Sequence, residues 1–238
     1  MSSLKVLLFD IDGTLLVSLQ RTSYRMRTKQ ALIEIFGTSG SIDTVSFSGK
    51  TDLQILREAL EPEGITSKEI WNFLPQIELA YMQVLKDLAD SGPVFDRCPG
   101  VGGLLDSLSS NSNYLLSLVT GNLERLAHTK LESVGLSSYF SHRGAFGSDH
   151  EDRRQLPTIA SNRIHQSLNL QQGSLSPSQF VVIGDTPRDI DCAHHFGAKA
   201  IAVSNGRYST SELNFYNPDF VFENFSDIET VIAAIDSL

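Results

Sequence analysis

Four short and almost continuously apolar runs are spaced along the chain, and each is followed by polar or glycine residues. They are Leu4–Phe9, Tyr114–Val119, Phe180–Ile183 and Ala200–Val203. Runs of this length and composition are typical of strands that are buried on both faces of a parallel sheet. Because helical patterns follow most of these runs, the sequence predicts an α/β protein with a parallel sheet.

The segment between the first two predicted strands has a helical pattern throughout. Helices are predicted over Gln20–Phe36, over Asp52–Leu60 and over Thr66–Ala89, the last with a kink or a restart at Pro75. This stretch is too long for an ordinary connection between a strand and a helix. We therefore predict an all-helical cap domain at residues 18–92, inserted into a core formed by residues 1–17 and 93–238.

Composition narrows the choice of partners. The hydrophobic content of 41% and the charged content of 20% are those of an ordinary soluble globular protein. A net charge of −9 argues against a nucleic-acid partner and against an anionic membrane surface. Cys98 and Cys192 lie far apart and lack the spacing of metal ligands, which fits a reducing cytoplasm. We expect a cytoplasmic monomer or homodimer that acts on a small molecule.

Two aspartates follow the first predicted strand directly. Asp10 and Asp12 are two positions apart, so both side chains emerge on about the same side of the strand end, where open α/β sheets bind ligands. Neighbouring carboxylates repel each other, and a shared proton, a metal ion or a basic partner usually relieves the repulsion. The alternatives are an ordinary Asp-Gly turn and the start of a calcium loop. The positions of Gly13 and Arg21 do not match those of a calcium loop.

Three segments together resemble the motifs of the haloacid dehalogenase-like hydrolase superfamily. They are Leu7–Leu15, Leu118–Asn122 and Val182–Ile190, in the order in which the superfamily has them. The resemblance covers nearly the whole chain and is greatest to the phosphoglycolate phosphatase-like branch, whose helical cap lies between the first two motifs. It implies a Rossmann-like core and the Mg²⁺-dependent hydrolysis of a small phosphorylated metabolite.

The resemblance gives the two aspartates different roles. Asp10 would attack the phosphorus and form an aspartyl-phosphate, which divides one difficult displacement into two easier ones. Asp12 would donate a proton to the departing alkoxide and later accept one from the attacking water. Asp10, Asp185 and the main-chain carbonyl of Asp12 would supply oxygen ligands suited to Mg²⁺. Asp189 would be a further ligand or an acceptor behind the ligands, and its segment also fits a turn with a helix N-cap.

The second motif would bind the phosphoryl oxygens. Thr120 offers a hydroxyl, and Gly121 and Asn122 offer backbone N–H groups at the start of a helix predicted over Leu123–Ser133. Thr120 and Asn122 also fit the role of simple capping residues, with Asn122 as the N-cap.

A basic residue is expected ahead of the last motif, where the superfamily commonly has a lysine. This chain has two arginines there instead. Arg153 is favoured because the residues Glu151-Asp152-Arg153 resemble an arginine variant of the family. Arg154 is the alternative for this position, and we expect it to bind the substrate. Both arginines could instead pair with acidic neighbours on the surface. In the cap, Lys50 could reach a second anionic group on the leaving alcohol or could be a solvated charge.

Other functions are compatible with the same scaffold. A phosphomutase, similar to β-phosphoglucomutase, would pass the phosphoryl group to a second hydroxyl, and only the cap would distinguish it. A dehalogenase would have no use for a general acid at Asp12 or a metal at Asp185. A receiver-like signalling domain would store phosphate on Asp10, but the large cap and Asp12, which would speed up hydrolysis, argue against storage.

Overall fold

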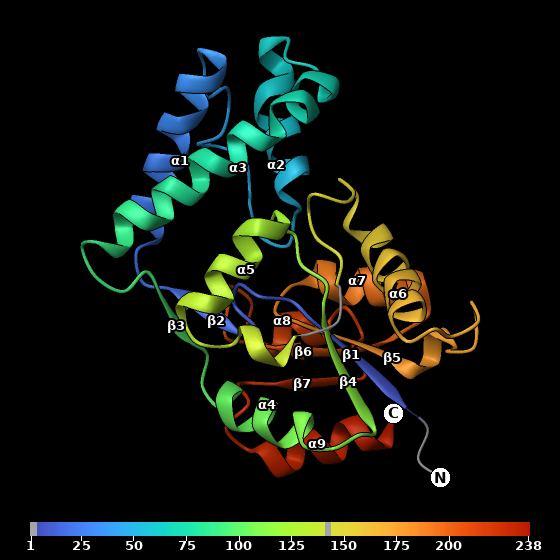
Figure 1. The fold of residues 1–238 in the computed structure, drawn as a ribbon. Helices are drawn as coiled ribbons and strands as arrows, with labels where there is room; N and C mark the ends of the chain where they lie inside the picture. The colour runs from blue at the N-terminus through green and yellow to red at the C-terminus, as the bar shows by residue number, and fades with distance from the viewer. Residues whose placement is uncertain (1–3, 141–143) are drawn as a thin grey trace.

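A computed structural model describes residues 4–140 and 144–238, in which strands and helices alternate along most of the chain (Figure 1). The strands are β1 (Lys5–Phe9), β2 (Leu16–Ser18), β3 (Phe95–Arg97), β4 (Tyr114–Leu118), β5 (Phe180–Gly184), β6 (Lys199–Val203) and β7 (Phe220–Phe222). The helices are α1 (Arg21–Phe36), α2 (Asp52–Leu60), α3 (Ser67–Ala89), α4 (Val101–Ser109), α5 (Glu124–Ser133), α6 (Leu156–Ser167), α7 (Pro187–Phe196), α8 (Thr210–Asn214) and α9 (Ile228–Ser237). Short 3-10 turns are η1 (Glu61–Glu63), η2 (Ser137–Tyr139), η3 (Arg153–Gln155) and η4 (Pro177–Gln179).

Five parallel strands form the main sheet, in the order β4-β1-β5-β6-β7. The four predicted strands are β1, β4, β5 and β6, and their bounds differ from the prediction by one residue at most at either end. Strand β7 was not predicted because its apolar run, Phe220–Phe222, is only three residues long. Strands β2 and β3 form a separate antiparallel pair.

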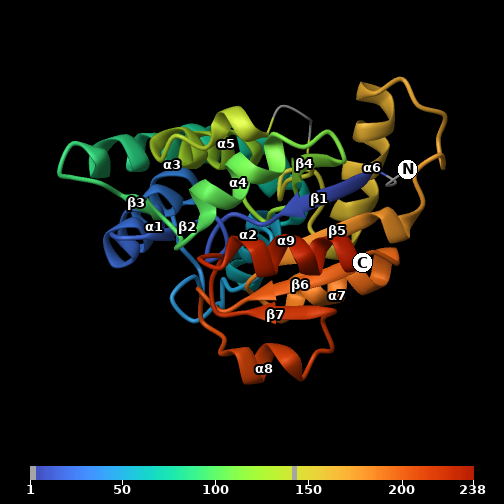
Figure 2. The same ribbon diagram turned by 90° about the horizontal axis from the view of Figure 1, so that it is seen from below.

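Helices cover both faces of the main sheet (Figure 2). Leu7 and Phe9 of β1 pack in one layer with residues of α4, α5 and α9. Val6 and Leu8 pack in the other layer, with residues of α6 and α7. All four side chains are fully buried, and burial of a large apolar side chain contributes about 1.5–3 kcal/mol. Burial on both faces explains the continuous apolar run and confirms the predicted α/β fold with a Rossmann-like sheet flanked by helices.

Helices α1, α2 and α3 lie together at one end of the molecule, and the chain enters and leaves them through β2 and β3 (Figure 1). The expected kink or restart at Pro75 does not divide α3, which runs unbroken from Ser67 to Ala89. Pro75 is exposed while its neighbours Leu74 and Ile77 are buried, so packing of the apolar face holds the helix where a backbone hydrogen bond is lost. The division into a cap at 18–92 and a core stays a prediction.

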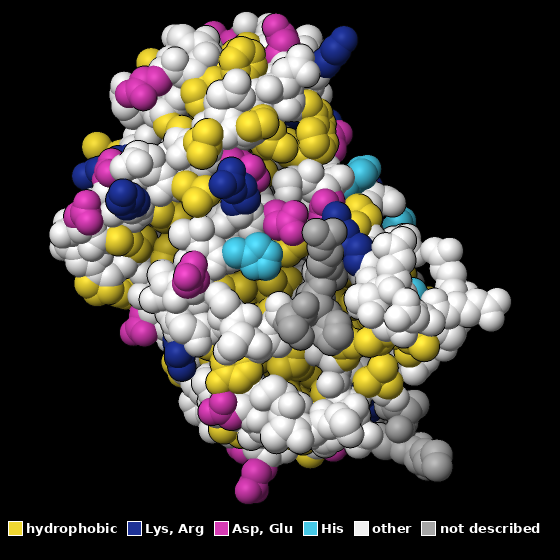
Figure 3. Space-filling view, viewed as in Figure 1, with side chains coloured by type: hydrophobic (Ala, Val, Ile, Leu, Met, Phe, Trp, Pro, Cys, Tyr) yellow, Lys and Arg dark blue, Asp and Glu magenta, His cyan; other side chains and the backbone are white. Residues whose placement is uncertain are grey.

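The surface gives no sign of one dominant charge on the face seen in Figure 3. Lysine and arginine side chains are interspersed there with aspartate and glutamate. Within the described part of the chain, no helix combines the length and the apolar character needed to span a membrane.

Candidate active site

Three predicted residues meet at the carboxyl ends of adjacent strands. Asp10 follows β1, Thr120 comes shortly after β4, and Asp185 follows β5. These strands are neighbours, with β1 in the middle, and the N–H of Asp10 donates to the carbonyl of Ile183 on β5 at 2.9 Å. All three side chains are buried, with residue exposures of 4% for Asp10, 0% for Thr120 and 5% for Asp185. The parallel sheet therefore brings together residues that are far apart in the sequence.

Asp10 has a buried cation beside it. Nη2 of Arg153, in η3, lies 3.0 Å from Oδ1 of Asp10 and 2.5 Å from Oδ1 of Asp189. The side chains of all three are at most 6% exposed, so water screens these charges little. Burial raises the pKa of Asp10 to about 6, although Arg153 acts in the opposite direction. Nη1 of Arg153 donates to the carbonyl of Gly49 at 3.3 Å and so connects this ion pair to the loop before α2.

Buried carboxylates at this edge could hold a metal ion. Oxygens of Asp10, Asp185 and Asp189 lie within 4.8 Å of one another. Oδ1 of Asp185 is buried and has no hydrogen-bond partner among the described residues, and a Cβ added at Gly13 or Gly206 would lie 2.3 or 1.7 Å from Oδ2. Burial, and then the charges of Asp189 and Asp10, raise the pKa of Asp185 well above its ordinary value. A hard divalent cation would satisfy the unpaired oxygen and offset the repulsion, so the donor set fits such an ion.

Asp189 is the most fully engaged of the three carboxylates. Its Oδ1 faces Arg153, and its Oδ2 accepts from the backbone N–H of Thr186 at 2.9 Å and from the hydroxyl of Thr186 at 2.7 Å. These bonds form the capping box that starts α7. Of the two roles expected for Asp189, this geometry favours that of an acceptor that orients Arg153 over that of a direct metal ligand.

Asp12 points to a different cation. Nζ of Lys130, on α5, lies 2.9 Å from Oδ1 and 2.7 Å from Oδ2 of Asp12. Nδ2 of Asn122 donates to Oδ2 of Asp12 at 2.8 Å, and Nζ of Lys130 donates to Oδ1 of Asn122 at 2.6 Å. Lys130 is only 6% exposed, whereas 44% of the Asp12 side chain is exposed. The two aspartates of the first motif thus have separate basic partners.

Lys130 was not predicted as a site residue, although its position on the apolar face of α5 is unusual for a lysine. Leu126, Ala127 and Leu131 are buried residues of α5, and Lys130 is buried with them. Because lysine is seldom buried without a partner for its charge, a lysine on the apolar face of a predicted helix indicates a nearby carboxylate. The sequence does not indicate which carboxylate this is, because Asp12 is 118 positions away.

The turn between β4 and α5 is covered by the loop before α2. A Cβ added at Gly121 would lie 2.1 Å from the carbonyl oxygen of Lys50, so a glycine is required for this close approach. The N–H of Asp52 donates to the carbonyl of Gly121 at 2.7 Å, and the Asp52 carboxylate accepts from the N–H of Leu123 at 2.8 Å. An acidic side chain of the protein itself therefore occupies one N–H group at the start of α5.

Helix α5 begins at Glu124 with Leu123 as its N-cap, one residue later than predicted. Asn122 does not act as the predicted N-cap because its Nδ2 donates to Thr120 Oγ1 at 2.8 Å and to Asp12. Its side chain thus connects the first and second motifs. Phosphoryl binding by the N–H groups of Gly121 and Asn122 stays a prediction.

Comparison with known protein families gives a match between residues 7–203 and the family described as haloacid dehalogenase-like hydrolase. The match covers most of the chain. The chain belongs to the haloacid dehalogenase-like hydrolases. The resemblance that the three motifs suggested is thereby confirmed.

Curated relatives of this hydrolase align over nearly their whole length. A phosphoglycolate phosphatase of Mannheimia succiniciproducens is 23% identical over 236 residues, which cover 97% of this chain and 99% of the relative. The pyrophosphatase PpaX of Oceanobacillus iheyensis is 22% identical, with 97% of each chain covered.

Solved structures share the fold of the hydrolase. A predicted phosphoglycolate phosphatase from Haemophilus somnus superposes with a TM-score of 0.66 at 21% identity and covers 98% of this chain and 99% of its own. CbbY from Rhodobacter sphaeroides, in complex with phosphate, gives a TM-score of 0.65 at 14% identity, with coverages of 94% and 96%.

Two predicted residues of the hydrolase lie outside the carboxylate cluster. Arg154 turns to the carboxylate of Asp152, with Nη2 2.8 Å from Oδ2, and half of its side chain is exposed. Nζ of Lys50 forms an ion pair with Glu58 on α2. The structure therefore brings Arg153, and not Arg154, to Asp10, and it gives Lys50 a partner within the segment predicted as the cap.

The same segment supplies polar groups that were not predicted. Burial raises the pKa of Asp52 to about 6, and the charge of Lys130 opposes this rise. Burial also raises the pKa values of the Tyr24 and Tyr81 hydroxyls, and the charge of Asp52 adds to both effects. The Tyr24 and Tyr81 hydroxyls are therefore neutral, and Asp52 lies close enough to both to affect their pKa values.

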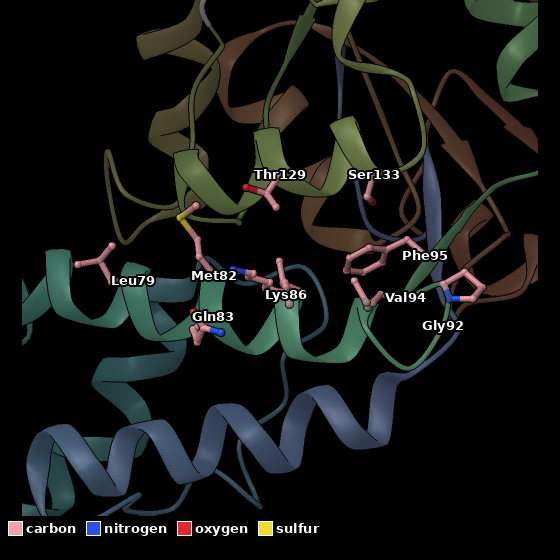
Figure 4. A pocket seen from close by; sticks show the side chains of 12 residues that line it. Leu79, Met82, Gln83, Lys86, Gly92, Val94, Phe95, Thr129 and Ser133 are labelled. Atoms are coloured by element: carbon pink, nitrogen blue, oxygen red, sulfur yellow. The ribbon is translucent and has the colours of Figure 1, made fainter.

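Two cavities in the described part of the hydrolase differ in how they relate to the Asp10 cluster. A cavity of about 510 Å³ lies between α3 and α5, with Leu79, Met82 and Phe95 among its mostly apolar lining (Figure 4). No carboxylate of the Asp10 cluster lines it. A polar cavity of about 390 Å³ is lined by Arg153 together with other charged and polar residues, which are Gln54, Arg57, Glu151, Asp152, Arg154, Arg188 and Asp191. Of these two cavities, the polar one extends to Arg153, the cation beside Asp10.

Proposed function

We propose that this hydrolase removes phosphate from a small phosphate monoester, with Mg²⁺ as cofactor and with an aspartyl-phosphate on Asp10 as intermediate. The observation that carries the proposal is the buried ion pair of Asp10 with Arg153, at the strand end where Asp185 has an unpaired oxygen. The names of the curated relatives, phosphoglycolate phosphatase and pyrophosphatase, support a small phosphorylated substrate.

In the first step a carboxylate oxygen of Asp10 attacks the phosphorus. The bond between Asp10 and phosphorus forms while the bond from phosphorus to the alcohol oxygen breaks. Arg153 holds Asp10 in place, and the hydroxyl of Thr120 donates to a phosphoryl oxygen. Asp12 gives its proton to the departing oxygen, so that a neutral alcohol leaves. Holding nucleophile and acid in one rigid site replaces a bimolecular encounter by an intramolecular one.

In the second step water attacks the phosphorus of the intermediate. Asp12 accepts the proton of that water, the bond between phosphorus and Asp10 breaks, and inorganic phosphate and the Asp10 carboxylate are formed. Asp10, Asp185 and the Asp12 carbonyl would hold Mg²⁺, which supplies positive charge that offsets the charge of the phosphoryl group.

The hydrolysis of 4-nitrophenyl phosphate tests this proposal. We expect turnover with Mg²⁺, loss of turnover in excess EDTA, and recovery when Mg²⁺ is added back. Asp10→Asn removes the nucleophile and is expected to lower kcat by about 10⁴-fold or more. Turnover that survives EDTA or Asp10→Asn would contradict the aspartyl-phosphate mechanism.

Two further outcomes would indicate other functions of the scaffold. A phosphoprotein that forms on Asp10 and persists without turnover would favour a receiver-like role. Conversion of a sugar phosphate to its isomer without release of inorganic phosphate would favour a phosphomutase. Phosphoglycolate and pyrophosphate, the substrates in the names of the relatives, are the first compounds of a specificity panel.

A further inference from the structure

We propose that Lys130 is a positioning residue, which holds the carboxyl group of Asp12 at the leaving-group side of the site. The inference rests on the proposed function, because it gives Lys130 its role through proton transfer by Asp12. No motif named in the sequence contains Lys130.

The hydrogen bonds around Asp12 form a closed network. Lys130 contacts both carboxylate oxygens of Asp12, at 2.9 and 2.7 Å, and Asn122 donates to one of them at 2.8 Å. Lys130 also donates to Asn122 at 2.6 Å, and Asn122 donates to the hydroxyl of Thr120 at 2.8 Å. Asp12, Lys130 and Asn122 each bond to the other two, so the rotamer of Asp12 is held by groups on α5 and on the turn between β4 and α5.

Lys130 is itself held by elements from two parts of the chain. Its Nζ lies 5.9 Å from the ring centroid of Tyr24 on α1 and 5.4 Å from that of Phe95 on β3, distances at which a cation interacts with an aromatic face. With 6% exposure its charge is nearly removed from water, and a buried ammonium needs a hydrogen-bonded counter-charge. In its ionised form, which accepts the proton of water in the second step, Asp12 provides this counter-charge with two oxygens, so a displaced Asp12 would leave Lys130 without its ion pair.

The arrangement also separates the two aspartates of the first motif. Asp10 and Asp12 would repel each other and would compete for Arg153 and for a metal ion if both had only those partners. Lys130 draws Asp12 toward α5, while Arg153 keeps Asp10 beside Asp185 and Asp189. Nucleophile and proton donor can then approach one phosphate ester from different directions, as displacement with protonation of the leaving oxygen requires.

Activity on two substrates of similar shape distinguishes the positioning of Asp12 by Lys130 from a purely structural role of Lys130. Benzyl phosphate releases an alkoxide that needs a proton, whereas 4-nitrophenyl phosphate releases a phenolate that is stable without one. A residue that acts through the proton donor affects the first substrate more than the second. A residue that only supports the fold affects both equally.

The experiment measures kcat and KM on both substrates, with Mg²⁺, for the full chain and its Lys130→Met variant. We expect Lys130→Met to lower kcat/KM, which reports the steps up to departure of the alcohol, by about 10²-fold or more on benzyl phosphate and by about 10-fold or less on 4-nitrophenyl phosphate. Lys130→Arg should recover part of the loss, because it keeps a cation on the same face of α5. Lys68→Met, an exposed lysine on α3, is the matched control and should change neither substrate.

A second test compares the activity of the double variant, Asp12→Asn with Lys130→Met, with that of Asp12→Asn alone. If Lys130 acts through Asp12, Asp12→Asn with Lys130→Met should be no slower on benzyl phosphate than Asp12→Asn alone. The double variant also removes both charges of the pair, so it decides the question if Lys130→Met alone does not fold, as judged by circular dichroism.

Equal losses on both substrates, or losses by the two substitutions that multiply, would overturn the role of Lys130. A wild-type enzyme that hydrolyses 4-nitrophenyl phosphate but not benzyl phosphate would also overturn it, because no proton donor would then be in place. The aspartyl-phosphate mechanism stands in each case as long as turnover needs Mg²⁺ and Asp10, and the last outcome removes from it only the role of Asp12 as proton donor. Failure of the proposed function is separately visible as turnover that survives EDTA or Asp10→Asn.

Discussion

The two sides of the site are built differently although they begin two residues apart. On the Asp10 side, Arg153, Asp185 and Asp189 are all buried and all belong to segments that follow or lie between core strands. On the Asp12 side, the side chain of Asp12 is 44% exposed, and its surroundings include Lys130 and residues of the helical segment between β2 and β3.

This difference suggests separate roles for the two sides: reaction at the phosphoryl group on the Asp10 side and recognition of the leaving alcohol on the Asp12 side. Under the proposed function, the buried and paired charges beside Asp10 would hold the phosphoryl group, which is common to all phosphate esters. The Asp12 side contacts α1 through Lys130 and Tyr24, so we expect sequence changes on α1 to affect the leaving alcohol more than the nucleophile. Substitutions on the first side should therefore affect all phosphate esters alike, whereas those on the second should depend on the leaving group.

Among the cations of the two sides, the largest effect is expected from substitution of Arg153 by methionine. Loss of this cation should lower kcat/KM by about 10²–10³-fold, and by the same factor for benzyl and 4-nitrophenyl phosphate, because Arg153 pairs with Asp10. Arg153→Lys keeps the charge and serves as the variant that still folds, since an unpaired Asp10 and Asp189 would destabilise the core. Arg154→Met is the control, with an expected change below about 2-fold for an exposed pair. A larger loss in Arg154→Met than in Arg153→Met would reverse the assignment of the two arginines.

Gly121→Ala tests how closely the turn between β4 and α5 must approach the loop before α2. Its new Cβ would lie 2.1 Å from the carbonyl oxygen of Lys50, a backbone atom that cannot turn aside, so the loop before α2 must move. We expect a loss of about 1–3 kcal/mol in the free energy of unfolding, measured by urea denaturation, and a lower kcat on every substrate. Gly102→Ala on α4 is the control, because its Cβ would meet only the end of the Arg97 side chain. Equal stability of the two variants would show that the loop does not need this contact.

The sequence predicts the Asp10 side far better than the Asp12 side, for a physical reason. Asp10, Thr120 and Asp185 each follow a buried strand, and parallel strands place such ends together whatever lies between them. Lys130 and Asp52 find their partners across 118 and 71 positions, on a helix face and a loop whose packing no local pattern specifies. Pro75 shows the same limit, because tertiary packing keeps α3 continuous against the local preference.

On the Asp12 side, we expect Asp52→Asn to change the free energy of unfolding by an amount that depends on pH. Burial raises the pKa of Asp52 to about 6 from an ordinary value of 3.8, so the folded protein binds this proton more tightly than the unfolded chain. The charge then costs stability that is absent below pH 3.8, grows as the pH rises to about 6 and is complete above it. Asparagine removes the charge and keeps an oxygen for the N–H of Leu123.

We therefore expect the free energy of unfolding of Asp52→Asn, relative to the wild type, to increase by about 1–2 kcal/mol between pH 4 and pH 7. Urea denaturation at pH 4, 5, 6 and 7 measures this difference. Asp90→Asn, at the exposed end of α3, is the control for ordinary surface carboxylates. If the difference in free energy of unfolding between Asp52→Asn and the wild type did not change with pH, burial would not raise the pKa of Asp52.

The smallest effect is expected from Lys50→Met, which addresses whether the cap side contributes a cation to the substrate. Lys50 forms an ion pair with Glu58, so its charge is already matched within the loop and α2. We expect kcat/KM on phosphoglycolate and on 4-nitrophenyl phosphate to change by less than about 3-fold, as is usual for one partly exposed ion pair. If KM rose by about 10-fold or more for phosphoglycolate alone, this expectation would be contradicted. Such a result would mean that Lys50 leaves Glu58 for the carboxylate of the substrate, and that leaving-group selection on the Asp12 side includes charge.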